Sequence, residues 1–383
     1  MKKLCLIISV ILCVVLLFNS IAAFADAEDD GILTLEEAKA LALKNDVQFN
    51  LQQSYIQQAS ESYEEVYDNN TKTDNTNYNS LADRASAAVS RKVSIESAAS
   101  SSRRAVFERN DLKRASDYNV TEAFYGVIEA KYSLMDAEAE MELKRKDLEI
   151  AKIKYGLSII TKNSLSQVES AVTSSQTAYN KTFSELQNSM SKLSKNIGKN
   201  LDVFNDKLDM TLNVPDIKSL DLNKIKVDYM KNNSSYYSAK EQYDLAEYKL
   251  QLTEEQYDYY YKRLPNRTST IVEQFDEMLS KAKRDFADAK YSFSEKEKDL
   301  DVTLNSQYTS INNLYESYET QKKEIEDTKL TIEQNRIKYQ MGLITKAVLE
   351  SSAASLNKLV NQLNATIINL NTQYMNMTQY SLD

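Results

Sequence analysis

A ten-residue segment that occurs twice constrains this chain more than any other feature. Residues 153–162 read IKYGLSIITK and residues 337–346 read IKYQMGLITK, so six of the ten positions are identical at an offset of 184 residues. Each copy lies between two long stretches of helical pattern and contains one glycine, Gly156 or Gly342. The sequence therefore predicts two copies of a helical hairpin, each ending in a short turn region that we call the tip.

Apolar residues spaced seven apart flank both tips, and the two sets share the same offset. The first set is Val120, Val127, Leu134, Met141, Leu148, Tyr155, Leu165, Val172, Tyr179, Leu186 and Leu193. The second set is Leu304, Ile311, Tyr318, Ile325, Ile332, Tyr339, Leu349, Leu356, Leu363, Leu370 and Met377. A sustained seven-residue spacing predicts helices that pack against one another as coiled coils. We interpret both stripes as core residues with no chemical role.

Few residues interrupt these helices, because the 383 residues include only 5 Gly and 2 Pro. Thr34 and Glu37 form a capping box that predicts the start of the first helix. Gly198 is placed to end the helix that follows the first tip. Polar residues 68–77 and the segment around Pro265 predict two breaks. A helix of about 70 residues is about 105 Å long, so we expect an elongated rod.

The fold class that follows is all-α, with two repeats of long antiparallel coiled-coil helices. The first repeat is expected at 26–208 with its tip at 155–162, and the second at 209–383 with its tip at 339–346. Outgoing helices are expected over about 35–67 and 221–262. Each outgoing helix is followed by a break, a long returning helix, the tip and a final helix.

Residues 1–25 have the pattern of a secretory signal peptide. Two lysines precede a long apolar run, and Ala23 and Ala25 form a small-residue cleavage pattern. The alternative is an uncleaved membrane anchor. We expect an exported protein of the cell envelope, in the outer membrane if the host has one and otherwise on the extracytoplasmic surface.

The residue inventory excludes several kinds of chemistry. Both cysteines lie within 1–25 and the chain has no histidine, which excludes thiol and imidazole catalysis and Cys/His zinc sites in the mature protein. A formal net charge of −9 argues against nucleic acid as a partner. Acidic pairs such as Glu36 and Glu37 lack a matched acid, base or pocket signal. We therefore predict no enzymatic activity and no cofactor.

Three features of the sequence together resemble the TolC family of outer-membrane efflux factors. Residues 33–46, LTLEEAKALALKND, are similar to the family's N-terminal signature. The tips, with YGLSIIT at 155–161 and MGLIT at 341–345, resemble its Val-Gly-Leu-Ser/Thr turn, and the internal repeat of long helices is the family pattern. The resemblance implies a homotrimer that forms a hollow helical tube. It also implies that the tips form the tube's inner end and bind an adaptor (membrane fusion) protein of an efflux or secretion pump.

The partner-binding residues implied by this resemblance lie on the two turns. They are Gly156, Leu157, Ser158, Met341, Gly342, Leu343 and Thr345. We expect Leu157 and Leu343 to be exposed and outside the packing stripes. We expect each glycine to allow a left-handed turn conformation.

The sequence also departs from the family in two places. Lys162 and Lys346 follow the tip threonines, where the family often has an acidic residue, so no acidic cation-binding constriction is carried over. Neither break has the alternating pattern that a membrane-spanning strand requires. We therefore expect a barrel-poor or barrel-less relative, with membrane association possible through the envelope. The competing hypothesis is an exported coiled-coil structural or interaction protein without a conduit.

Overall fold

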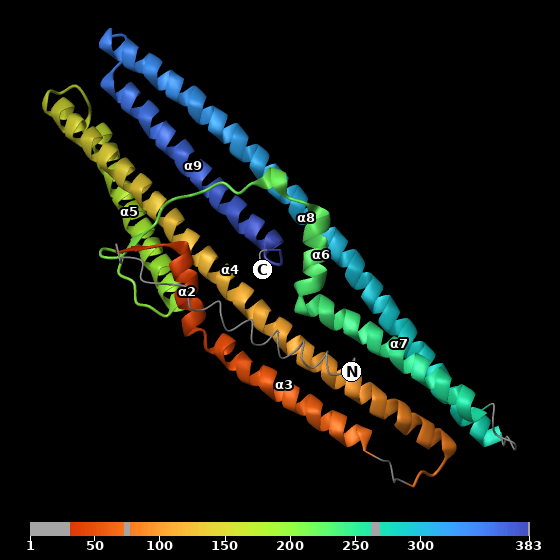
Figure 1. Ribbon diagram of the computed structural model, residues 1–383. Helices are drawn as coiled ribbons and strands as arrows, with labels where there is room; N and C mark the ends of the chain where they lie inside the picture. The colour runs from red at the N-terminus through yellow and green to blue at the C-terminus, as the bar shows by residue number, and fades with distance from the viewer. Residues whose placement is uncertain (1–30, 73–76, 262–268, 382–383) are drawn as a thin grey trace.

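The structure, a computed structural model, describes residues 31–72, 77–261 and 269–381. In this part of the chain eight α-helices form an elongated bundle (Figure 1). The expected signal peptide at 1–25 lies outside the described residues, as do residues 73–76 of the first break and the segment around Pro265. Residues 68–71 of the first break are helical. The prediction that the breaks contain no membrane strands therefore stays untested. No described helix is long and apolar enough to cross a bilayer.

The helices follow the predicted order in each half of the sequence. The first half contains α2 (Leu35–Asn45), α3 (Val47–Thr71), α4 (Leu81–Gly156) and α5 (Lys162–Ile197). The second half contains α6 (Leu222–Asn232), α7 (Ser234–Tyr261), α8 (Ser269–Gln340) and α9 (Lys346–Thr378). With 76 residues, α4 is about 114 Å long. The α4–α5 and α8–α9 turns lie at one end of the rod, and the last residues of α3 and α7 lie at the other, with the first residues of α4 and α8 (Figure 1).

The two outgoing helices are each divided in two, so the prediction of single helices over 35–67 and 221–262 was wrong. Asp46 separates α2 from α3, and its carboxylate accepts hydrogen bonds from the backbone N–H groups of Gln48 and Phe49. Asn233 separates α6 from α7, and its side-chain oxygen accepts from the Tyr236 N–H at 2.7 Å. Asp and Asn readily cap a new helix start, and both residues take extended backbone angles at these positions.

The segment between the two halves adds a small strand pair that the sequence did not predict. β1 (Ile32–Leu33) pairs in parallel with β2 (Lys207–Leu208), and η2 (Ile217–Ser219) follows as a single 3₁₀ turn. Leu208 and Ile217 are buried in the two different cores described next. The linker therefore packs against both halves of the bundle.

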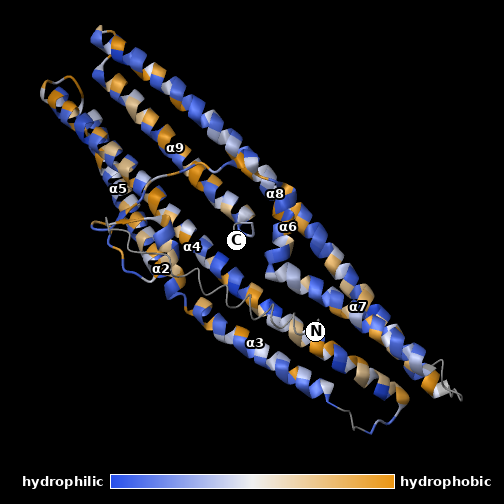
Figure 2. Ribbon diagram, viewed as in Figure 1, coloured by the Kyte–Doolittle hydropathy of each residue, from blue (hydrophilic) through white to orange (hydrophobic). Residues whose placement is uncertain are grey.

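Two apolar cores correspond to the two stripes. One joins α2, α4 and α5 and includes Ile368 of α9, and the other joins α6, α8 and α9 and includes Tyr236 of α7. A third, smaller cluster packs Ala82 and Ala85 of α4 against Phe275 of α8. Orange and blue residues alternate along the helices in Figure 2, as expected of helices with one buried face. Burial declines toward each tip: Val120 and Val127 are buried, Leu148 is half-buried and Tyr155 is exposed. The second half shows the same order in Leu304, Ile311, Ile332 and Tyr339.

A buried cation connects the two halves near the middle of the rod. Arg114 of α4 is only 7% exposed. It pairs with Asp111 at 3.1 Å and donates to the backbone carbonyls of Asn232 and Gln379. Its guanidinium also lies 4.7 Å from the centre of the Tyr380 ring. We call this group of contacts the Arg114 clasp, because one side chain of α4 holds the end of α6 and the residues after α9.

The partners of Arg114 are also bonded to one another. Asn232 donates to the Tyr380 carbonyl at 2.9 Å, and Asn233 donates to the Tyr380 hydroxyl at 2.6 Å. The second oxygen of Asp111 accepts from the Ser234 N–H at the start of α7. A buried charge is tolerated only when it is paired and hydrogen-bonded, and the Arg114 clasp meets both conditions.

A first prediction concerns this clasp. Replacing Arg114 with alanine should lower the free energy of unfolding by about 3 kcal/mol, because Asp111 and two carbonyls lose a buried charged partner. The matched control is Arg104→Ala on the same helix, since the side chain of Arg104 is much more accessible to solvent and pairs with Glu108 at 3.4 Å. Arg104→Ala should lower the free energy of unfolding by less than about 1 kcal/mol. Urea unfolding of both variants provides the test, and equal losses would contradict the role assigned to the clasp.

A second prediction concerns glycine. Gly198 ends α5 with a φ of +66°, and a Cβ placed there would lie 2.8 Å from Nδ2 of Asn45. That amide donates to the Ile197 carbonyl at 2.7 Å. Gly198→Ala should therefore destabilise the protein by about 2 kcal/mol, because it adds left-handed strain to a steric clash.

The control for Gly198 is Gly126, which lies inside α4, where a Cβ would meet no neighbouring atom within 4 Å. Gly126→Ala should raise the free energy of unfolding by about 0.5–1 kcal/mol, because alanine restricts the unfolded chain and favours helix. Thermal melting of the two alanine variants should shift Tm in opposite directions. Shifts of the same sign would contradict the backbone conformations assigned to the two glycines.

Candidate functional site: the two tips

The two tips have the same backbone structure at an offset of 184 residues. In the first tip, the Ile159 N–H donates to the Lys154 carbonyl at 2.8 Å and the Ser158 N–H donates to the Tyr155 carbonyl at 2.9 Å. In the second tip, Leu343 donates to Lys338 and Gly342 to Tyr339 at the same two distances. This pair of bonds is the Schellman motif, which ends a helix with one left-handed residue.

The left-handed residue is not the expected glycine in the first tip. Gly342 has a φ of +71°, as predicted, but its counterpart is Ser158, with a φ of +60°. Gly156 is the last residue of α4 and lies outside the positive-φ positions. The expectation that Gly156 provides the left-handed turn was therefore wrong. The 184-residue offset, which aligns Ser158 with Gly342, is the sequence signal that identifies the correct position.

Both turns expose large apolar side chains. The exposed fractions are 67% for Leu157, 65% for Ile159, 68% for Met341 and 66% for Leu343. Leu157 and Leu343 are thus exposed as predicted. Ile159 was not among the predicted site residues, although the repeat aligns it with Leu343. The loop of the first tip is strongly hydrophobic in Figure 2, although it lies at the end of a polar rod.

The threonine that precedes the next helix makes a side-chain capping hydrogen bond in the first tip but not in the second. Thr161 is the N-cap of α5, and its hydroxyl accepts from the Ser164 N–H at 3.2 Å. Thr345 occupies the same position before α9, but its side chain makes no capping bond. Lys162 and Lys346 follow as the first residues of α5 and α9. The structure thus places Gly156, Leu157, Ser158, Met341, Gly342, Leu343 and Thr345 in two matching turns at one end of the rod (Figure 1).

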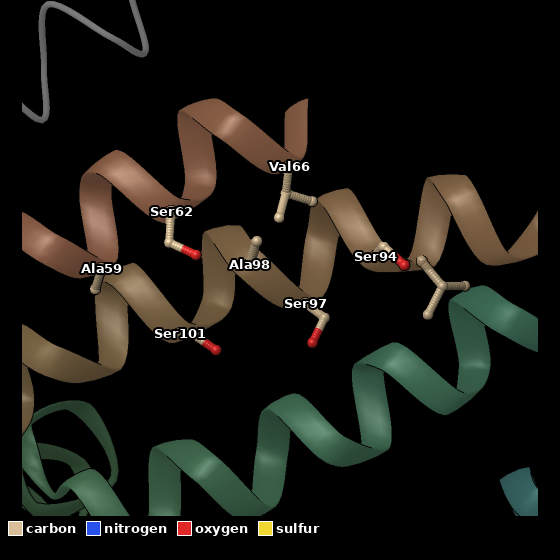
Figure 3. Close-up of a pocket in the computed structure, with 8 residues that line it drawn as sticks. Ala59, Ser62, Val66, Ser94, Ser97, Ala98 and Ser101 are labelled. Carbon is tan, nitrogen blue, oxygen red and sulfur yellow. The ribbon is translucent and has the colours of Figure 1, made fainter. Parts of the chain in front are cut away.

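A cavity of about 410 Å³ lies elsewhere, where α4 passes between α3 and α7. Its lining is small and uncharged: Ala59, Ser62, Val66, Val93, Ser94, Ser97, Ala98 and Ser101. In Figure 3, Ser62 and Val66 of α3 point toward Ala98 of α4, and Ser97 and Ser101 point away from α3. Small side chains let helices approach closely, and we interpret the cavity as a gap in this packing layer. Across the described ranges, no group of His, Cys, Asp and Glu is arranged to hold a metal ion.

Comparisons with known proteins give a consistent result at the level of the fold. No protein-family profile and no curated protein matches the sequence. The outer membrane protein VceC from Vibrio cholerae matches in structure with a TM-score of 0.63 and 12% identity, over 90% of this chain and 95% of that chain. The CmeC outer membrane channel of Campylobacter jejuni matches with a TM-score of 0.62 and 12% identity, over 90% and 85%. The outer-membrane channel OprN gives 0.65 and 9%, over 90% and 89%.

These matches cover most of this chain and most of each matched structure. At such low identity they establish the architecture alone. The predicted all-helical rod and the resemblance inferred from the sequence are both confirmed at this level. The chain has the fold of the TolC-family outer-membrane efflux channels.

Proposed function

We propose that the protein is a trimeric helical conduit whose tips dock an adaptor of an export pump. The TolC-like fold supports a channel or conduit role in the cell envelope. The observation that carries the docking proposal is the tip geometry. Two matching turns lie at one end of the rod, and each exposes two large apolar side chains that belong to neither core. Exposed apolar groups gathered at one place usually mark a contact surface.

We propose a trimer because the helices of a single chain pack too closely to leave a passage between them. The apolar cores fill the space between the helices within each half and also between the halves, as expected for packed helix bundles. Several apolar side chains nevertheless remain exposed along the shaft, including Val47, Met135 and Val302. Neighbouring copies of the chain would cover such residues and surround a lumen. The division into repeats at 26–208 and 209–383 belongs to this proposal.

A second candidate is an exported coiled-coil protein without a conduit. It is favoured by one observation: residues such as Val127, Ile311 and Leu370 are already fully buried within a single chain. Such a rod needs no partner to bury its central stripe. The two candidates differ in the oligomeric state that they require.

A third prediction follows from this difference. The mature protein, produced without residues 1–25, should sediment as a trimer at micromolar concentration, because one chain cannot surround a lumen. Sedimentation equilibrium is the measurement, and negative-stain images should show a ring with a central hole when viewed along the rod. A stable monomer or dimer would exclude the conduit and favour the coiled-coil rod.

A fourth prediction concerns docking. The double variant Leu157→Asp with Leu343→Asp should bind the adaptor at least about tenfold more weakly, because two carboxylates would be desolvated in an apolar contact. Helicity and the free energy of unfolding should barely change, since neither leucine packs in a core. Calorimetric titration with the adaptor and circular dichroism provide the two readouts.

Two further variants separate docking from folding. Tyr55→Asp with Tyr291→Asp alters side chains that are 51% and 69% exposed and lie on α3 and α8, away from the tips, and this variant should bind the adaptor normally. Gly342→Val should lower stability, because valine is strained at a φ of +71°. Unchanged adaptor binding by the double Leu→Asp variant would show that the tips are ordinary turns.

A further inference from the structure

The tips differ in charge from the rest of the chain. We define the tip segments as residues 150–168 and 334–349. Each contains three basic residues and no acidic residue, although the whole chain has a formal net charge of −9. The six basic residues are Lys152, Lys154, Lys162, Arg336, Lys338 and Lys346. All six are exposed, and both segments lie at the same end of the rod (Figure 1).

These charges are poorly neutralised within the chain. Arg336 lies 3.9 Å from Glu333, and Lys346 lies 3.4 Å from Glu350. Both acidic partners are just outside the tip segments, and both pairs are accessible to solvent, so they contribute little. Among the described residues, no ion pair joins the other four basic side chains to a carboxylate. The end of the rod is therefore a positively charged surface on an acidic protein.

Local helix stability explains some of these residues but not others. Lys154 and Lys338 lie in the last turns of α4 and α8, where a positive charge favours the helix dipole. Lys162 and Lys346 are the first residues of α5 and α9, where a positive charge opposes the dipole. Neither first turn contains an acidic residue. Since both tips place lysine where glutamate would stabilise the helix, the charge is better explained by a contact outside the chain.

The shape of the surface distinguishes between kinds of partner. Exposed apolar residues run down α4 through Ile150, Ile153 and Leu157, and down α8 through Leu330, Ile337 and Met341. At 1.5 Å per residue these stripes are about 10 Å and about 16 Å long. A flat membrane would touch only the turns at the apex. A helix laid alongside the shaft would cover a stripe of this length.

We propose that the docking partner presents acidic amphipathic helices, whose apolar faces cover these stripes and whose Asp and Glu residues face the six basic residues of the tip segments. This inference rests on the proposed docking function and assigns the chemistry of its partner. Opposite charges at the rim would speed association and fix the register of the two surfaces. Lys162 and Lys346 then contribute to binding at the expense of helix stability.

The test reverses charge at the two unfavourable positions. The double variant Lys162→Glu with Lys346→Glu is compared with Lys283→Glu with Lys290→Glu, which makes the same charge change at exposed residues of α8 far from the tip. The probe is the recombinant adaptor of the host cell's own export pump, titrated at several salt concentrations. The tip variant should bind at least about tenfold more weakly and depend less on salt, because repulsion replaces attraction at the rim. The control should bind like the unmodified protein.

The unfolding temperature provides a separate readout. The tip variant should melt at about the same temperature as the unmodified protein, because the gain from glutamate at two helix starts is offset at position 346 by loss of the exposed pair with Glu350 and by repulsion between the two carboxylates. A weaker binder that is equally or more stable would support the inference, since loss of folding could not explain the loss of binding. Restoration of binding when an acidic residue on the adaptor's docking helix is changed to lysine would support it further.

The outcomes separate this inference from the function on which it rests. If the adaptor binds both double variants and the unmodified protein equally, the proposal of an acidic partner is wrong, while the proposed docking function is retained. If the adaptor fails to bind the unmodified protein, the docking function itself is overturned. Phosphatidylcholine vesicles with and without phosphatidylglycerol form the last arm. Charge-dependent binding to the anionic vesicles, without binding to the adaptor, would overturn the inference in favour of a membrane surface.

Discussion

The fold depends on the packing of other helices against one very long helix, α4. A helix in a protein gains most of its stability from the packing of its apolar face, and α4 has buried residues from Ala82 to Ala151. Large side chains such as Phe124 and Ile128 are buried against α2 and α5, and small ones such as Ala85 face Phe275 of α8. Because α4 also contacts α3, α7 and α9, it is the helix around which the others are arranged.

Much of this arrangement could be predicted from the sequence, because the relevant signals are local and periodic. The seven-residue stripe and the scarcity of glycine and proline predicted the presence and the order of α4, α5, α8 and α9. The breaks at Asp46 and Asn233 were missed because the helical pattern continues through them. Only the capping ability of Asp and Asn, repeated at equivalent places, indicates that a new helix begins there.

The candidate site, like the fold, could be predicted only in part from the sequence. The repeat located both tips, and their apolar residues are exposed as expected. The wrong choice of Gly156 arose because glycine is the usual left-handed residue, whereas a small polar residue such as Ser158 can take the same conformation at a modest energetic cost. The Arg114 clasp could not be predicted, because its partners are backbone carbonyls far away in sequence. Long-range contacts of this kind leave no periodic signal.

The sequence separation within the Arg114 clasp has a consequence for the order of folding. The hairpins α4–α5 and α8–α9 join residues that are neighbours across short turns, and such contacts form at low entropic cost. Arg114 instead contacts carbonyls 118 and 265 residues away, so this contact can form only after both hairpins have come together. A late contact of this kind affects the rate of unfolding more than the rate of folding. The clasp would then act mainly as a kinetic lock, which keeps the assembled rod from reopening once its two halves have met.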